Sequence, residues 1–428
     1  MRHLVRIGTW VLLVAWAAAP VCRAATLIER NSAARLGLVR AWYAQVGSPR
    51  ATGAIAHVNY AHGMLLVQSA RGMMTALDGE TGRILWATQA GSPDRLSTEP
   101  DANEEYVVVV NGSVLYVLDR AAGHIVWQKQ LGGAPGAGPG VTPTHAFVPM
   151  VSGRIEGYDL QEGAKQQPWF YKSAGRVLVP PLATDQSVSW TTEKGYFYVA
   201  DPSAGGIRFR LETRDAIHAR PAYWTPDLYA CSTDGYVYAL NAARGKSHWK
   251  FSLGDAIYKS PVAIEGKLFV VSQLSGMFCL DAAHGALLWT APRIVQFVAL
   301  SPSRIYAMDS LGQLTALDAK TGTRLGTLPL EGVSHTLVNR HSDRIFLASE
   351  NCVVQCLHEI GLPSPVSYVS PPPEKVESKR KASQPAEEPA DEPQEVSPAG
   401  EPAAEKMPAK TDQTPEAPVE DDADNPFK

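Results

Sequence analysis

Short runs of alternating apolar and polar residues recur along most of the chain, and turn-forming residues separate them. The stretch 267–281, KLFVVSQLSGMFCLD, contains two such runs on either side of a Ser-Gly turn. Alternation with a period of two residues is typical of β-strands that bury one face. The pattern therefore predicts an all-β fold built from many short strands.

These strands belong to copies of one longer unit. The stretch 74–91, MTALDGETGRILWATQAG, returns in altered form at 115–132, 237–254 and 277–294. Each unit holds four predicted strands, and four-stranded units with a period near 40 residues are typical of β-propeller blades. One turn residue marks each of the eight copies: Asp78, Asp119, Asp159, Asp201, Asn241, Asp281, Asp318 and His358.

A large aromatic residue accompanies most copies, and we expect it to pack between neighbouring blades. A buried aromatic side chain covers roughly 150–250 Å². After the seventh turn, Leu325 is expected to take the place of the missing aromatic. The Asp and Gly residues of the turns suit tight backbone turns, so these repeated positions are interpreted as structural. The predicted blade-docking residues are Trp42, Trp86, Trp127, Trp169, Phe209, Trp249 and Trp289.

The two ends of the repeat array complement each other. The eighth copy ends near His358 without an aromatic strand, whereas residues 36–47 contain Trp42 with no turn residue before it. We expect this N-terminal strand to complete the eighth blade, because ring closure removes exposed sheet edges. The predicted domain is an eight-bladed β-propeller over residues 25–362.

The N-terminal residues 1–24 are predicted to be a signal peptide. They begin with basic residues, continue with a short apolar stretch and end in small residues, with cleavage expected after Ala24. A lipid anchor on Cys22 is not expected, because Val21 stands where a small residue is required. The protein is therefore expected to be exported to the periplasm, the cell envelope or beyond, and to be peripheral to a membrane at most.

Residues 363–428 are rich in Pro, Glu, Ala and Lys. They hold 14 of the 32 prolines and 15 acidic residues against 7 basic ones. Such a composition cannot bury enough apolar surface to offset the entropy of folding, so it predicts a disordered tail. The rest of the chain is nearly neutral, and nothing indicates binding to nucleic acid.

Four cysteines remain after the predicted cleavage, and their spacing matches neither a disulfide framework nor a zinc site. We expect them to be buried thiols that pack as small apolar residues. No metal-binding residue is predicted. The four are Cys231, Cys279, Cys352 and Cys356.

The stretch ALDGETGRILW at 76–86 and its copies resemble the tryptophan-docking repeats of the pyrroloquinoline-quinone (PQQ) type. This family forms eight-bladed propellers and includes quinoprotein dehydrogenases and the outer-membrane assembly factor BamB. The resemblance covers residues 36–360. It implies a non-catalytic, monomeric scaffold that binds protein partners in the cell envelope, although fold alone does not determine function.

Two other functions remain open. A PQQ-dependent dehydrogenase would, by the same resemblance, carry an adjacent Cys pair, Glu, Asn and Asp ligands for calcium, and large inserted loops. The blades here are nearly minimal and contain no adjacent Cys pair, so we expect no catalytic and no cofactor-binding residue. The third possibility is a propeller that binds a small ligand or a glycan at the ring centre.

The centre of the ring is where such a ligand would bind. The innermost strands are expected to begin at recurring prolines, namely Pro100, Pro143, Pro181, Pro221 and Pro261. Polar residues near these prolines are expected at one mouth of the central channel, where they form a candidate site for an anion or a polar partner, or else ordinary solvated lining. These residues are Glu99, Thr142, His218, Arg220, Tyr258, Lys259 and Ser260.

Overall fold

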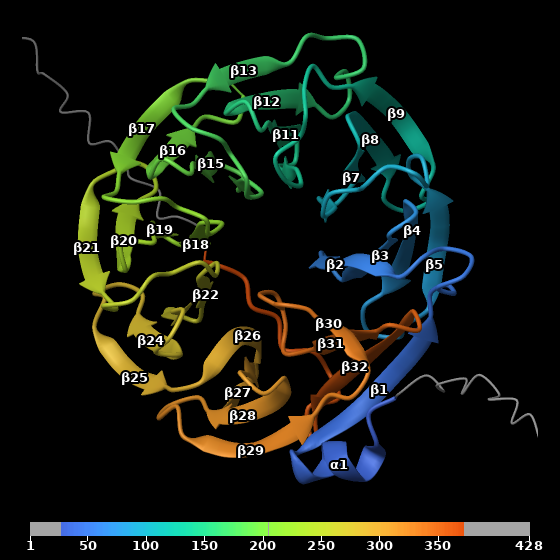
Figure 1. Ribbon diagram of the computed structural model, residues 1–428, viewed down its shortest axis with the longest axis vertical. Helices are drawn as coiled ribbons and strands as arrows, with labels where there is room; N and C mark the ends of the chain where they lie inside the picture. The colour runs from blue at the N-terminus through green and yellow to red at the C-terminus, as the bar shows by residue number, and fades with distance from the viewer. Residues whose placement is uncertain (1–26, 204, 372–428) are drawn as a thin grey trace, which may run out of the picture. The chain divides into compact units, whose positions relative to one another are not determined.

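The computed structural model describes residues 27–203 and 205–371, which form a closed ring of eight four-stranded antiparallel sheets (Figure 1). The predicted signal peptide and most of the predicted tail lie outside these residues. A short helix, α1 (Arg30–Arg35), precedes the ring.

Each blade is an antiparallel meander in which the first strand lies nearest the ring centre and the last strand lies at the rim. In blades 1 to 7 the four strands follow in chain order: β2 (Ile55–Ala61), β3 (Met64–Ser69), β4 (Met73–Asp78), β5 (Ile84–Gln89); β6 (Asp101–Ala102), β7 (Tyr106–Asn111), β8 (Val114–Asp119), β9 (Ile125–Gln130); β10 (Gly140–Val141), β11 (His145–Pro149), β12 (Arg154–Asp159), β13 (Trp169–Lys172); β14 (Leu182–Ala183), β15 (Val188–Thr191), β16 (Tyr196–Ala200), β17 (Ile207–Glu212); β18 (Ala222–Trp224), β19 (Asp227–Cys231), β20 (Tyr236–Asn241), β21 (Ser247–Ser252); β22 (Val262–Ile264), β23 (Lys267–Val271), β24 (Met277–Asp281), β25 (Leu287–Ala291); β26 (Ile294–Leu300), β27 (Arg304–Asp309), β28 (Gln313–Asp318), β29 (Arg324–Pro329). Blade 8 consists of β30 (Val333–Thr336), β31 (Ile345–Ser349), β32 (Val353–Glu359) and β1 (Leu38–Gln45).

The position of a strand within its blade explains its sequence. The second strand of blade 2, YVVVVN in β7, is apolar at successive positions because neighbouring blades cover both of its faces. The outer strand of blade 1, ILWATQ in β5, has only Trp86 buried. The hydrophobic core is therefore a series of clusters between blades.

In every blade except the seventh, an aromatic residue of the outer strand joins the blade to the next one, as predicted. Trp86 is 8% exposed, and its Nε1 donates a hydrogen bond to the carbonyl of Arg120 in blade 2 at 2.8 Å. Its ring covers Gly123 in the turn of that blade, where φ is +73° and a Cβ would lie 2.3 Å from the indole. Only glycine adopts this positive φ without strain and leaves room for the indole ring.

The same contact closes the ring. β1 pairs with β32, so the N-terminal strand is the outer strand of blade 8. The Nε1 of Trp42 donates to the carbonyl of Gly79 in blade 1 at 3.0 Å, and its ring covers Gly82. The prediction that residues near the N-terminus complete the eighth blade is confirmed.

The expectation for Leu325 is wrong, because this side chain is 53% exposed. Gly326 occupies the aromatic position instead, opposite Ala316 in the ladder. The space is filled by Leu36, whose Cδ1 lies 2.9 Å from where a Cβ on Gly326 would stand. The residue that follows α1 thus fills the joint between blades 7 and 8.

The acidic turn residues organise the turns that receive the aromatic rings. In blade 1, Oδ1 of Asp78 accepts hydrogen bonds from the amides of Glu80 and Thr81, and from the Thr81 hydroxyl at 2.6 Å. The Thr81 hydroxyl is the main reason that the pKa of Asp78 lies below its usual value. The structural interpretation of these residues is consistent with these contacts.

All four cysteines of the described region are buried and free, as expected from their spacing. Burial is the main cause that raises the pKa of Cys279, to about 12. Within residues 27–203 and 205–371, the structure contains no helix of the length and apolarity that a membrane crossing requires.

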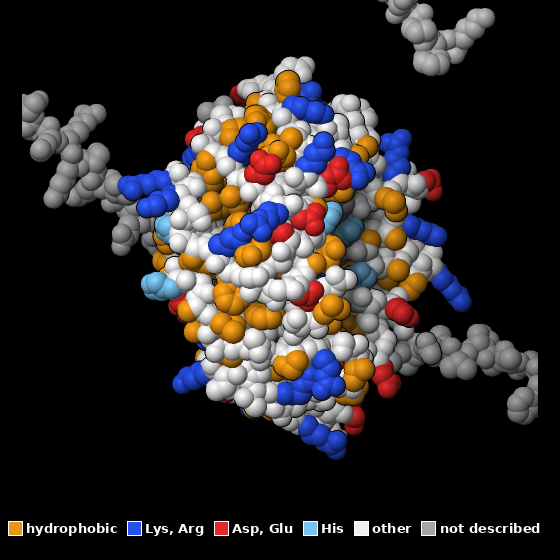
Figure 2. All heavy atoms as spheres, turned by 60° about the vertical axis from the view of Figure 1, so that its left-hand side comes forward, with side chains coloured by type: hydrophobic (Ala, Val, Ile, Leu, Met, Phe, Trp, Pro, Cys, Tyr) orange, Lys and Arg blue, Asp and Glu red, His pale blue; other side chains and the backbone are white. Residues whose placement is uncertain are grey.

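The outer strands expose one unpaired edge each, and charge protects several of them. Figure 2 brings forward the side of the ring that includes β17 and β21, where Lys and Arg side chains stand among smaller apolar patches. Arg208 and Arg210 are exposed on β17, and Lys250 is exposed on β21 with its ammonium over the ring of Tyr236. Charged outer strands disfavour edge-to-edge association of sheets.

Candidate functional site

Two residues from opposite parts of the ring meet in the central channel. Arg220 lies two residues before β18 of blade 5, and Asp101 opens β6 of blade 2. Their side chains form an ion pair with 3.7 Å between Nη2 and Oδ2. Because these blades are three places apart in the ring, the pair spans the channel itself.

A second arginine adds to this charged centre. Arg340 follows β30 of blade 8, and burial is the main cause that lowers its pKa to about 10, followed by the charge of Arg220. Burial also raises the pKa of Asp101, which Arg220 and two backbone amides partly offset. The Nε atoms of both arginines are buried without a hydrogen-bond partner. With Glu99 nearby, the channel centre holds two positive and two negative groups.

Most of the other predicted mouth residues surround this centre. The amide of Arg220 donates to the hydroxyl of Ser260 at 3.0 Å. The rings of His218 and Tyr258 stack with 6.0 Å between centroids and 18° between planes. Tyr258 and Lys259 are exposed, so this mouth offers an aromatic and basic rim to solvent.

Thr142 is not at this mouth, and the sequence-based placement of its strand was wrong. The innermost strand of blade 3 is Gly140–Val141, so the preceding proline is Pro139, and Pro143 lies beyond the strand. Thr142 is buried in the turn after the strand, where its hydroxyl accepts a hydrogen bond from the amide of His145. Thr142 therefore follows the innermost strand of its blade, whereas the proline pattern predicts that it precedes this strand.

The sequence predicts that the propeller ends at residue 362, but the chain packs on the ring as far as residue 371. Residues 360–371, called here the strap, run from blade 8 inward to blade 5, visible as the red end of the chain in Figure 1. Tyr368 of the strap is 6% exposed, and its hydroxyl donates to the carbonyl of Leu300 at 3.0 Å. Ser370 bonds Thr225 in the β18–β19 turn. The first nine residues of the predicted tail are therefore part of the folded domain.

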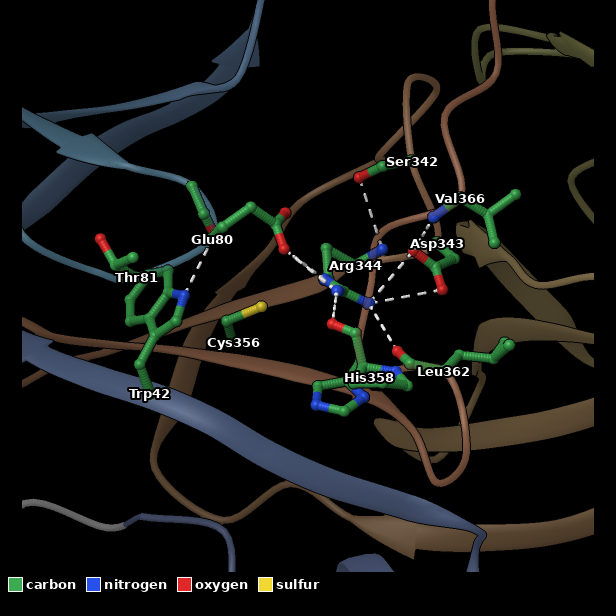
Figure 3. A network of polar contacts seen from close by, with 12 residues as sticks. Trp42, Glu80, Thr81, Ser342, Asp343, Arg344, Cys356, His358, Leu362 and Val366 are labelled. Carbon is green, nitrogen blue, oxygen red and sulfur yellow. Dashed lines mark hydrogen bonds and ion pairs between the residues drawn. The ribbon is translucent and has the colours of Figure 1, made fainter.

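Arg344 joins the strap to both sides of the ring closure (Figure 3). Its side chain is 2% exposed, and its guanidinium pairs with Glu80 of the blade 1 turn at 3.0 Å. It also contacts Asp343 at 3.3 Å and donates to the carbonyls of Leu362 and Pro363. Asp343 in turn accepts the amide of the strap at Val366. A buried arginine whose donors are all directed at acceptors fixes the geometry of the groups around it.

The channel centre does not suit a PQQ group with calcium. Such a site needs free carboxylates as hard oxygen ligands for the cation. Here Asp101 already binds Arg220 and the amides of Ala102 and Val141. In the part of the chain that the structure describes, no three His, Cys, Asp or Glu side chains lie together as a metal site would require.

The sequence analysis proposed residues for one channel mouth, but it did not include the charged residues of the channel centre or the residues that hold the strap. Asp101 and Arg340 carry no motif, and their meeting with Arg220 depends on the ring geometry. Arg344 and Tyr368 also escaped notice. The only available signal was that Tyr368 is one of two aromatic residues in an otherwise polar, proline-rich segment.

Comparisons with known proteins agree with this architecture. The family model described as outer membrane protein assembly factor BamB matches residues 40–169, 111–221 and 193–358, and so reaches every blade. A curated relative, the outer membrane protein assembly factor BamB of Xanthomonas campestris pv. campestris, is 27% identical over 184 residues. That match covers 40% of this chain and only 44% of the relative's length.

Solved structures share the fold at low sequence identity. BamB from Moraxella catarrhalis is similar with a TM-score of 0.61 and 16% identity, over 75% of this chain and 99% of that one. The computationally designed Ika8 protein has a TM-score of 0.58 and 15% identity, over 71% and 96% of the two chains. At identities this low, the similarity shows only that the fold is shared.

Proposed function

This chain belongs to the family of the outer membrane protein assembly factor BamB, and from that premise we propose that it is an exported, non-catalytic scaffold for protein partners in the cell envelope. The observation that carries the proposal is the family match across all eight blades. In this role the propeller makes or breaks no bond. It presents loops on a rigid disc so that partner proteins are held in a fixed arrangement.

The geometry of the ring supports this role. Trp42, Trp86 and their counterparts tie blades together at seven of the eight joints, Leu36 fills the remaining joint, and Arg344 binds the strap to the closure. A disc held this way keeps its loops in place when a partner binds, so little ordering entropy is lost at the interface. The channel centre is occupied by the protein's own ion pair, which leaves the two faces and the rim as the surfaces for partners.

The predicted export fits the same role. Residues 1–24 lie outside the described region, so export and the expected lack of a lipid anchor on Cys22 remain predictions. We propose a periplasmic location, peripheral to the outer membrane, with the chain acting as a monomer. The relatives named for outer membrane protein assembly make proteins of that pathway the first partners to test.

The test is crosslinking in intact cells of the source organism, with the affinity-tagged chain as bait, followed by mass spectrometry. We expect outer-membrane assembly proteins to be enriched over a control bait, an unrelated eight-bladed propeller directed to the same compartment. Equal recovery with both baits would contradict the scaffold role. A stoichiometric chromophore with alcohol or sugar oxidation after adding PQQ and calcium would replace it with an enzymatic one.

A further inference from the structure

A groove on the strap side of the ring lies at the joint between blades 6 and 7. Its volume is about 460 Å³, within the range that binds side chains or small ligands. Both blades and the strap contribute to its wall, so it exists only in the complete fold. The lining residues are Glu265, Lys267, Leu300, Ser301, Pro302, Ala319, Val366 and Tyr368.

This joint differs from the others in its tryptophan contact. At five joints the indole nitrogen donates a hydrogen bond to the carbonyl that follows the turn residue of the next blade, as Trp42 does to Gly79. Trp289 makes the equivalent ring contact with Gly322, yet its Nε1 is buried without a partner. An unpaired buried donor is costly, so its presence needs an explanation.

Lys267 donates to the carbonyl that this bond would use. Its ammonium donates to the carbonyl of Ala319 at 3.2 Å, and this is the carbonyl that the repeat pattern assigns to Trp289. An ammonium has three donors, and this is the one hydrogen bond of Lys267 among the described residues.

The groove leaves that ammonium available to an outside anion. Glu265 lines the same groove but does not form an ion pair with Lys267 within the described chain. The exposed Pro302 and the partly exposed Val366 line the groove over the buried Leu300 and Tyr368. The site thus combines an ammonium that has no carboxylate partner among the described residues with a small apolar surface.

We propose that this groove docks a segment of a protein partner that carries one Asp or Glu side chain beside a bulky apolar residue. The inference rests on the proposed scaffold function and names the chemistry of the partner. The carboxylate binds the Lys267 ammonium, and the apolar residue packs against the strap. Glu265, exposed at the groove, repels a run of acidic residues, so a single carboxylate is favoured.

Binding should be detectable inside the joint. The Lys267 ammonium and the Trp289 ring both contact the blade 7 turn, at Ala319 and at Gly322. A carboxylate that draws the ammonium away from this turn changes the surroundings of the neighbouring indole. The indole N–H resonance of Trp289, assigned with Trp289→Phe, reports this change.

The test uses two acetylated and amidated peptides, GSFELSG and GSFQLSG, which differ only in the carboxylate. Their binding to the full-length protein is measured by fluorescence anisotropy with a labelled form of each. We expect the Glu peptide to bind at least tenfold more tightly than the Gln peptide, a typical effect of one charge-assisted contact. Lys267→Met should abolish the difference, whereas Lys267→Arg and the exposed control Lys246→Met should keep it.

The Trp289 resonance is the second readout. It should shift when the Glu peptide binds and stay in place when the Gln peptide is added, because only the carboxylate moves the ammonium beside this turn. Equal binding of the two peptides, absence of binding, or retained discrimination in Lys267→Met would overturn the proposal.

The crosslinking experiment separates this inference from the proposed function. If Lys267→Met captures the envelope partners as efficiently as the wild type does, the scaffold role stands and the groove is not the docking site. If the wild type captures no specific partner, the scaffold role fails, and the peptide result then decides the groove by itself.

Discussion

Trp42→Ala tests the ring closure most directly, because Trp42 lies close to the start of the described chain. The side chain is 8% exposed, covers Gly82 of blade 1 and donates to the carbonyl of Gly79 at 3.0 Å. Removing a large buried aromatic residue typically costs about 3–5 kcal/mol of unfolding free energy. The loss should equal that of Trp86→Ala, which has the same exposure at the joint between the consecutive blades 1 and 2.

The expected change in melting temperature follows from the size of the domain. Unfolding entropy is about 2.1 cal/mol/K per residue, so roughly 345 described residues give about 0.7 kcal/mol per kelvin. A loss of about 3–5 kcal/mol then lowers the melting temperature by about 4–7 °C. Differential scanning calorimetry of the purified variants measures this shift.

Tyr43→Ala is the matched control, because Tyr43 is the next residue on β1 and is 60% exposed. It should change the melting temperature by about 1 °C or less, as surface substitutions usually do. If Trp42→Ala behaved like Tyr43→Ala, the N-terminal strand would not be holding blades 8 and 1 together. The closure described here would then be refuted.

Four further substitutions test other contacts. Trp289→Phe should destabilise the protein by about 1–3 kcal/mol less than Trp127→Phe in chemical denaturation, because only the Trp127 indole donates a hydrogen bond; equal losses would contradict this. Tyr368→Ala should cost about 3 kcal/mol, because the strap packs on the ring, and a silent variant would show that it does not. Arg344→Met should cost about 3–5 kcal/mol by leaving two carboxylates unpaired, and a neutral result would show that the network adds no stability. The pKa of Asp78 lies below its usual value in the folded state, so its stabilising contribution is present above about pH 4 and is lost as the pH falls through the folded-state pKa. Asp78→Asn should therefore reduce the fall in melting temperature below about pH 4, and an unchanged acid profile would argue against this carboxylate.

The asparagine variant is expected to fold because the protein already uses this residue in one turn. In blade 5, Oδ1 of Asn241 accepts the amides of Ala243 and Arg244, as Asp78 does in blade 1. Asparagine keeps the acceptor and removes the titration. The comparison therefore isolates the charge from the turn geometry.

The sequence by itself determined the features that repeat. Strand alternation, the turn residue and the following aromatic recur at a constant distance, so their period predicted the blade type, the number of blades and the closure by Trp42. Such features depend on contacts within a blade or between consecutive blades, which a periodic sequence records in every copy. One local error, Leu325 for Gly326, arose where the repeat lost its aromatic residue and Leu36, the residue after α1, filled the space instead.

The tertiary structure alone decided the features that occur once. The pair of Asp101 and Arg220 joins blades three places apart, and no spacing along the chain records which side chains meet across the channel. The strap is similar: its composition predicts a disordered tail, yet Tyr368 finds a buried place that only the assembled ring provides. The hydrogen bond from Lys267 to the carbonyl of Ala319 likewise arises from packing between two blades. Local periodicity therefore specifies the scaffold, whereas residues that occur only once become neighbours only when the ring is closed.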